Sequence, residues 1–106
     1  MNTISREELK MRMAQNRPVQ LLMALDRNNF ERQHIPGSVH FNHLEEAVKS
    51  LSPEQEVVVY CTNPTCPASY RAYYMLRSQG FKNLYRYTGG LEEWVAAGDP
   101  VEGKEV

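Results

Sequence analysis

The sequence predicts an α/β domain built on parallel strands. Apolar, strand-like runs alternate along the chain with amphipathic segments, which is the pattern of helices layered on a sheet. One run, Val57–Tyr60, is apolar without alternation, as strands covered on both faces of a parallel sheet are. The length of 106 residues suits one such domain. We therefore expect a single domain over residues 1–106, with a core of about 4–98 and a polar tail, 99–106, that frays.

The composition argues against several classes of partner. The formal net charge is −1 and the basic residues are scattered, so no nucleic-acid partner is expected. No apolar run approaches the roughly 20 residues of a membrane span, and the polar start of the chain lacks the apolar core of a signal peptide. We therefore expect a cytoplasmic protein with no membrane partner, whose two cysteines are free thiols.

The first half of the chain begins with a helix and a strand. Ser5 and Glu8 have the spacing of a capping box, which predicts a helix over 5–15 that Pro18 ends. The apolar run 19–25 predicts a buried strand. The next elements are expected at 28–32 (a short helix capped by Asp26), 35–37 (a turn), 38–41 (a strand) and 43–50 (a helix capped by Asn42).

The second half of the chain holds two strands, each followed by a helix. A polar loop, 61–66, follows the strand Val57–Tyr60, and Pro67 suits the first position of a helix that runs to about Gln79. Gly80 suits the left-handed cap of that helix. The remaining elements are a strand over 83–87, a glycine pair, Gly89-Gly90, that permits a tight turn and close backbone approach, and a helix that bears Trp94 and ends near Gly98.

The chemistry indicated by this pattern centres on Cys61. It directly follows the strongest strand, and ligands of parallel sheets bind just beyond the carboxyl ends of the strands. The helix expected from Pro67 adds unpaired N–H groups and the positive end of its dipole, which favour the reactive thiolate. The structural alternative is that Cys61 is only the small apolar end of a buried strand.

Four segments, in order, resemble the rhodanese-like family. They match its EFxxGHIPGA signature, its active-site strand and cysteine, its A…L…GF helix and its GGxxxW close. In this chain they are Asn29–Ser38, Val57–Cys61, the set Ala72, Leu76, Gly80 and Phe81, and Gly89–Trp94. The likeness extends from Ile4 to Gly103. It implies a three-layer domain with a central, mostly parallel sheet of about five strands, and sulfur transfer through a cysteine persulfide without a cofactor.

The resemblance also implies a site and substrates. Cys61 is the expected nucleophile. The expected substrate-binding loop consists of Thr62, Asn63, Pro64, Thr65, Cys66, Pro67, Ala68 and Arg71. The expected donor is a small sulfur compound such as thiosulfate or a persulfide, and the acceptor is a thiol, a protein or another small nucleophile.

The chain departs from the family at two places. The Asp and Arg usual in the family's first strand fall at Met23 and Leu25, while Asp26 and Arg27 lie out of register. The loop after Cys61 is also longer than usual and lacks the basic residue and glycines of many members. With less fixed positive charge for thiosulfate, we expect weak thiosulfate:cyanide activity.

Three hypotheses remain open for the second cysteine, Cys66. Cys66 stands at the expected N-cap, where the helix dipole acts most strongly on a thiol, and its spacing to Arg71 mimics the family's cysteine-to-arginine spacing. It is therefore either the sulfur carrier itself, a resolving thiol that attacks the persulfide on Cys61 and leaves a disulfide, or a spectator. The position of Cys61 at the strand end favours Cys61 as the carrier.

Two other functions compete with sulfur transfer. The fold without catalysis would serve as a binding or redox-sensing module that uses Cys61 and Cys66. A cysteine-based phosphatase of related fold requires an arginine six positions after its cysteine, and no arginine lies between Cys61 and Arg71 here. A metal site is not expected, because the chain has no CxxC or HxxxH pair, and His34 is expected to pack or hydrogen-bond.

Overall fold

The computed structural model describes residues 1–15 and 19–105; the predicted helix stop at Pro18 lies outside them. Within these residues, five parallel strands form one sheet in the order β1-β5-β4-β2-β3. The strands are β1 (Thr3–Ile4), β2 (Val19–Met23), β3 (Ser38–Val39), β4 (Glu56–Tyr60) and β5 (Leu84–Tyr87). The helices are α1 (Arg6–Ala14), α2 (Arg27–Arg32), α3 (Leu44–Ser50), α4 (Pro67–Ser78) and α5 (Gly90–Ala96). The predicted α/β class is confirmed.

Strand β4 occupies the centre of the sheet, as its unbroken apolar run predicted. It pairs with β2 on one side and with β5 on the other. Val57, Val58 and Val59 are fully buried, because side chains of a strand alternate between two covered faces. The residue that follows β4 therefore emerges at the middle of the sheet's carboxyl edge.

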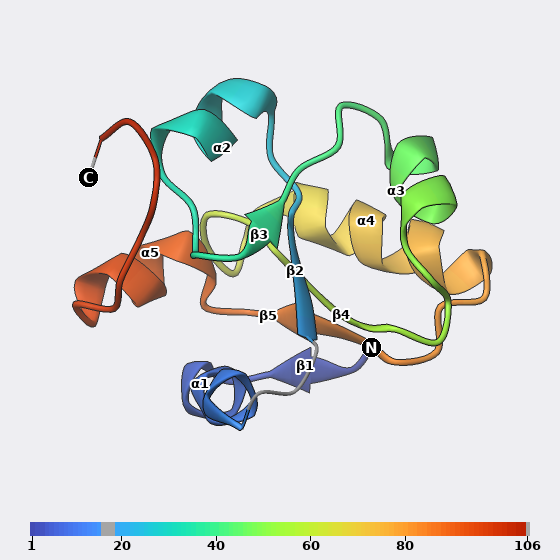
Figure 1. Ribbon diagram of the computed structural model, residues 1–106, viewed down its shortest axis with the longest axis horizontal. Helices are drawn as coiled ribbons and strands as arrows, with labels where there is room; N and C mark the ends of the chain where they lie inside the picture. The colour runs from blue at the N-terminus through green and yellow to red at the C-terminus, as the bar shows by residue number, and fades with distance from the viewer. Residues whose placement is uncertain (16–18, 106) are drawn as a thin grey trace.

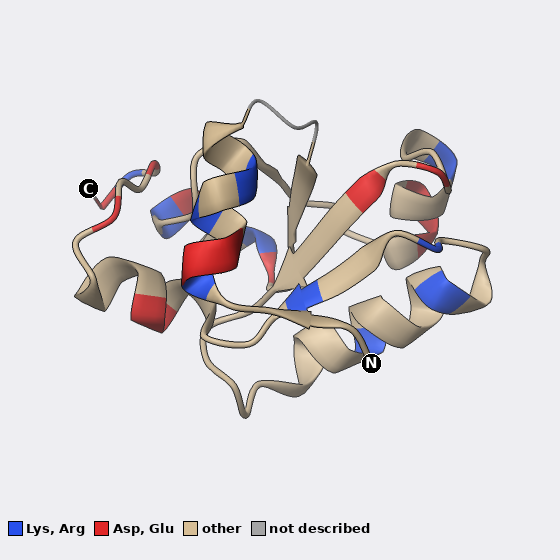
Figure 2. Ribbon diagram, turned by 90° about the horizontal axis from the view of Figure 1, so that it is seen from below, with Lys and Arg blue, Asp and Glu red and all other residues tan. Residues whose placement is uncertain are grey.

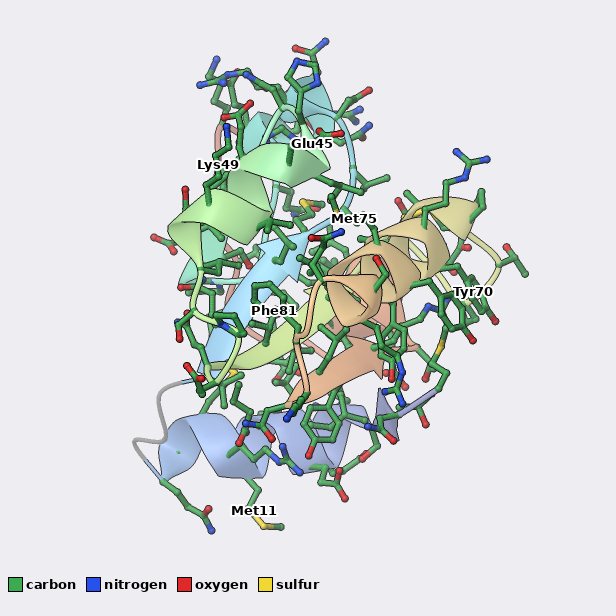
Figure 3. The ribbon with its side chains drawn as sticks, turned by 90° about the vertical axis from the view of Figure 1, so that its right-hand side faces the viewer. Met11, Glu45, Lys49, Tyr70, Met75 and Phe81 are labelled. Atoms are coloured by element: carbon green, nitrogen blue, oxygen red, sulfur yellow. A yellow bond between two sulfur atoms is a disulfide. The ribbon has the colours of Figure 1, made fainter. Side chains whose placement is uncertain are left out.

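Helices cover both faces of the sheet and give it two separate cores (Figure 1). One core packs β-strand residues against α1, α2 and α5, which contribute Leu9, Phe30 and Trp94 among others. The other packs them against α3 and α4, with Ala47, Ala72 and Leu76. Figure 3 shows Met75 between α3 and α4 and Phe81 beside the end of α4, where both add to this second core.

Two of the three predicted side-chain caps form, those of Ser5 and Asp26. The Ser5 side chain accepts a hydrogen bond from the Glu8 backbone N–H (3.2 Å), and that of Asp26 accepts one from Asn29 (2.9 Å). The cap predicted at Asn42 is wrong. The N-cap of α3 is His43, which makes no side-chain capping bond, so the packing of Ala47 and Leu44 fixes this helix rather than its cap.

The sequence pattern missed strand β1. Its two residues are too few to show alternation, and they form a strand because they pair with β5, Thr3 with Arg86 and Ile4 with Tyr87. Strand β2 ends at Met23, so the predicted strand was two residues too long.

The carboxyl-terminal segment is held by hydrogen bonds instead of fraying. Residues 34 and 102 form an antiparallel bridge, and the backbone N–H groups of Lys104 and Glu105 donate to the carbonyls of Glu31 and Arg32 (both 2.9 Å). The Trp94 indole donates to the Pro100 carbonyl (2.8 Å). The expectation of a frayed tail is wrong for residues 99–105, because polarity alone does not reveal backbone pairing.

Basic and acidic residues are interspersed along the helices, strands and loops (Figure 2). In the described part of the chain, no helix is long and apolar enough to cross a membrane.

Candidate functional site

Cys61 leaves the carboxyl end of β4 and forms a disulfide with Cys66. The Cα atoms are 6.3 Å apart, within the range that a disulfide spans. Cys61 is buried (1% exposed) and Cys66 is half-buried. The expectation of two free thiols is therefore wrong for this structure. The reason is geometric: the loop runs from the end of β4 to the start of α4, and this path brings the two cysteines close enough to bond.

Both sulfur atoms lie at the amino-terminal end of α4. Cys66 is the N-cap of this 12-residue helix and Pro67 is its first residue, as predicted. The first N–H groups of a helix have no partner within the helix, and the dipole there favours negative charge. Because the disulfide joins the two sulfurs, Cys61 shares this position with Cys66. A thiolate or persulfide formed on either cysteine would therefore meet a favourable local field.

The loop between the cysteines is tied together by Asn63. Its side-chain oxygen accepts hydrogen bonds from the backbone N–H and the hydroxyl of Thr65 (3.1 and 2.9 Å). Its carbonyl accepts one from the Cys66 N–H (3.3 Å). These two loop amides are thus used within the loop, while Pro64 and Thr65 at its apex are exposed.

The start of α5 holds the other end of the loop. The Leu91 and Glu92 N–H groups donate to the carbonyls of Cys61 and Thr62 (both 2.9 Å). Gly90 permits this approach, because a Cβ there would lie 2.6 Å from the Thr62 carbonyl oxygen and 2.7 Å from that of Cys61. Its φ of +69° also favours glycine. The close backbone approach predicted for Gly89-Gly90 is confirmed.

Arg86 of β5 contacts the cysteine loop and was not among the predicted site residues. It is 2% exposed. Its guanidinium donates to the Ser69 hydroxyl and to the Pro64 carbonyl (both 2.8 Å) and lies 4.1 Å from the centre of the Tyr70 ring. The available signal was an arginine inside a short run of otherwise apolar and aromatic residues, since charged residues are rarely fully buried unless they are paired.

Arg71 does not contact the loop through any described interaction. It is exposed and lines, with Ala68 and Ala72, one wall of a cavity of about 210 Å³ between α4 and the end of β2. Apolar side chains from the segment before and within α3, Phe41 and Leu44, form the opposite wall. The structure thus brings Arg71 and Ala68 to a cavity beside the cysteine loop and not into it.

A second cavity, of about 190 Å³, lies on the other side of the loop and includes Thr62. Met23 and Leu25, the positions at which the sequence resemblance places the family's usual Asp and Arg, line it together with Arg32 and Glu105. These two side chains make part of the cavity wall apolar.

The segment Asn29–Ser38, which resembles the family's EFxxGHIPGA signature, holds the residue before Cys61 in place. The Tyr60 hydroxyl, one residue before Cys61, accepts a hydrogen bond from the Ile35 N–H (3.1 Å) and pairs with the Ser38 hydroxyl (2.7 Å). Burial raises the pKa of Tyr60 to about 12, so it stays protonated at neutral pH. His34 donates from Nδ1 to the Phe30 carbonyl (2.7 Å) and stacks on the Phe30 ring, the packing role expected for it.

The comparison with protein families assigns the chain. The model of the rhodanese-like domain matches residues 5–97. The chain belongs to the rhodanese-like family. Among curated relatives, it is 37% identical over 71 residues to the thiosulfate sulfurtransferase GlpE of Pseudomonas syringae pv. syringae, a match that covers 65% of each chain. It is 29% identical over 86 residues to GlpE of Coxiella burnetii, covering 79% of this chain and 78% of the relative.

Two further proteins extend the comparison. The chain is 26% identical over 93 residues to the putative sulfur carrier protein YrkF of Bacillus subtilis, of which the match covers 49%. The solution structure of the rhodanese-like domain of the Anabaena sp. Alr3790 protein superimposes with a TM-score of 0.88 at 27% identity, covering 99% of this chain and 81% of that one. The predicted three-layer rhodanese-like fold is confirmed.

Proposed function

We propose that this rhodanese-like chain is a sulfurtransferase or sulfane-sulfur carrier that holds sulfur as a persulfide on Cys61. The observation that carries the proposal is the place of Cys61: it follows the central strand and shares the amino-terminal end of α4 with Cys66. The relatives named thiosulfate sulfurtransferase and sulfur carrier support the same class of chemistry.

The reaction begins once an external thiol reductant has opened the disulfide. The Cys61 thiolate attacks the sulfane sulfur of a donor such as thiosulfate. The donor's S–S bond breaks, sulfite leaves with the bonding electrons, and Cys61 carries a persulfide. An acceptor thiolate, on a small molecule or a protein, then attacks the outer sulfur and regenerates the Cys61 thiolate. The helix start stabilises the negative charge at each stage.

Cys66 enters the cycle as a resolving thiol. Its thiolate attacks the inner sulfur of the Cys61 persulfide, hydrosulfide leaves with the outer sulfur, and the Cys61–Cys66 disulfide forms. This product is the bond present in the structure. In the reducing cytoplasm proposed for the protein, a cytosolic disulfide of this kind is catalytic or redox-sensing rather than structural.

Mass spectrometry tests the proposal. Reduced wild type, Cys61→Ser and Cys66→Ser are treated with thiosulfate or a low-molecular-weight persulfide, and intact masses are recorded. We expect a gain of about 32 Da, one sulfur atom, on wild type and Cys66→Ser and none on Cys61→Ser. The gain lasts longest in Cys66→Ser, because no second thiol resolves it. A gain that survives in Cys61→Ser contradicts the carrier assignment, and no gain with any donor contradicts sulfur carriage.

The disulfide also favours a second candidate, a redox-sensing module. In that function the two cysteines switch between dithiol and disulfide without carrying a third sulfur. It predicts rapid oxidation of the reduced protein by peroxide to the disulfide, together with no mass gain from sulfur donors. The same mass measurements therefore separate the two functions.

A further inference from the structure

The buried guanidinium of Arg86 has only uncharged partners in its described surroundings. These are the Ser69 hydroxyl, the Pro64 carbonyl and the face of the Tyr70 ring. Within the residues that the structure describes, no carboxylate pairs with it. A buried charge is costly unless it is paired, so a cation held in this way calls for another source of compensation.

The location of Arg86 shows where that compensation is expected. Ser69 and Tyr70 belong to the first turn of α4, and Pro64 is the apex of the cysteine loop. The positive end of the α4 dipole faces the same loop. Two sources of positive potential thus converge on a segment whose cysteines are uncharged in the disulfide form and anionic as thiolate or persulfide.

Arg86 is held rigidly in this position. On the sheet it stands beside Val59 of the central strand, whose chain reaches Cys61 two residues later. Its backbone N–H donates to the Asn2 carbonyl (2.9 Å), and Tyr70 covers the guanidinium from the side of α4 that faces away from α3 (Figure 3). Ser69 is as buried as Arg86 itself. Strand and helix therefore hold the cation in place without help from a ligand.

We propose that Arg86 is a positioning residue of the sulfur site. It fixes the apex of the cysteine loop through Pro64 and supplies the positive charge that stabilises the anionic sulfur of Cys61. It thereby takes over, from the neighbouring strand, the electrostatic role of the loop basic residue that this chain lacks. The inference rests on the proposed function, but its test reads the thiolate and not the transfer of sulfur.

Other charged groups near the loop lie at its edges. Glu92 of α5 donates its backbone N–H to the Thr62 carbonyl. Arg71 of α4 lines the cavity on one side of the loop, and Arg32 and Glu105 line the cavity that contains Thr62. All four side chains are exposed, so solvent screens them more strongly than it screens Arg86.

The experiment uses a single-thiol background. In reduced Cys66→Ser protein, the rate of alkylation of Cys61 by iodoacetamide is measured against pH, alone and combined with Arg86→Met, Arg86→Lys or Arg12→Gln. Arg12 is the matched control: it too stacks on a tyrosine, Tyr85 of the same strand, but it pairs with the carboxylate of Glu56. Circular dichroism establishes that each variant is folded.

We expect Arg86→Met to move the midpoint of the alkylation profile upward by about one pH unit. Arg86→Lys, which keeps the charge, moves it by less than half as much, and Arg12→Gln leaves it in place. We also expect Arg86→Met to lower the rate with anionic iodoacetate, relative to neutral iodoacetamide, by about fivefold.

Two results would overturn the inference. One is a shift in Arg86→Met no larger than that in Arg12→Gln, and the other is an equal shift in the Met and Lys variants, which would remove the role of charge. If Arg86→Met does not fold, the ratio of the iodoacetate rate to the iodoacetamide rate in Arg86→Lys decides. A ratio equal to that of the parent supports the role of the positive charge, and a lower ratio overturns the inference. Failure of sulfur loading with an intact thiolate effect would contradict the proposed function alone.

Discussion

At the scale of single residues, Gly90 determines how closely α5 approaches the cysteine loop. Its missing side chain lets two backbone amides reach the carbonyls of Cys61 and Thr62. Gly98 has a similar positive φ, +79°, but no atom lies within 4 Å of the position that its Cβ would take. An alanine at Gly98 therefore adds only backbone strain, whereas an alanine at Gly90 adds the same strain and also displaces the loop.

We expect Gly90→Ala to lower the free energy of unfolding by about 1–3 kcal/mol more than Gly98→Ala does. Both variants pay for an alanine at positive φ, but only the first forces the loop carbonyls away from α5. Urea denaturation measures the difference, and sulfur loading of the same proteins shows whether the displaced loop still accepts sulfur. Equal destabilisation of the two variants would show that the contact is unimportant.

Single residues also mark the limit of what the sequence reveals. The place of Cys61 at a strand end was predicted because it follows an unbroken apolar strand, and the close approach at Gly90 was predicted from its glycine pair. The disulfide stayed one of several alternatives, since five-residue spacing fits a bridge only once the loop is known to return to the strand end. Arg86 was missed because alternation in a four-residue strand does not show that both faces are buried.

At the scale of elements, an ion-paired cluster joins α1 to the segment after α5. Asp99 accepts hydrogen bonds from Lys10 (2.6 Å) and Arg6 (2.7 Å). The bond from Lys10, followed by that from Arg6, lowers the pKa of Asp99 below its usual range.

Elements were predicted well where local signals decide them, as at Ser5 and Asp26, and poorly where pairing decides them, as in β1.

The lowered pKa gives Asp99→Asn a pH-dependent effect. A carboxylate whose pKa is lower in the folded state stabilises the fold above its unfolded-state pKa of about 3.9, and this contribution is lost as the pH falls below it. We expect Asp99→Asn to lower the Tm at pH 7, with a difference from wild type that shrinks below about pH 4. Thermal melts across this range measure it. Glu7→Gln, at an exposed and longer ion pair, is the control and should change the Tm little at either pH.

At the scale of the whole molecule, two cores on opposite faces of the sheet carry the fold, and the disulfide joins the residue after the central strand to the N-cap of α4. The α/β class and the order of the elements followed from the sequence because each long element has its own periodicity or cap. The closure of the carboxyl-terminal segment on α2 did not, because it depends on backbone bonds between distant residues.

Reduction of the disulfide should leave this fold intact. The bridge closes a loop with a sequence separation of only 5 residues, so chain entropy limits its contribution to about 2 kcal/mol. We expect unchanged far-ultraviolet circular dichroism and a modestly lower Tm in the presence of a reductant. The double variant Cys61→Ser/Cys66→Ser should show no response to it. Loss of helical signal at room temperature on reduction would mean that the bridge is structural, which would count against a catalytic disulfide.

The pairing of the carboxyl-terminal segment with α2 matters for anyone who labels this protein. Glu105 forms part of the wall of the cavity that contains Thr62, so a purification tag or fluorophore joined after it starts beside the cysteine loop. Attachment before β1, at the far edge of the sheet, keeps such additions away from that loop (Figure 1).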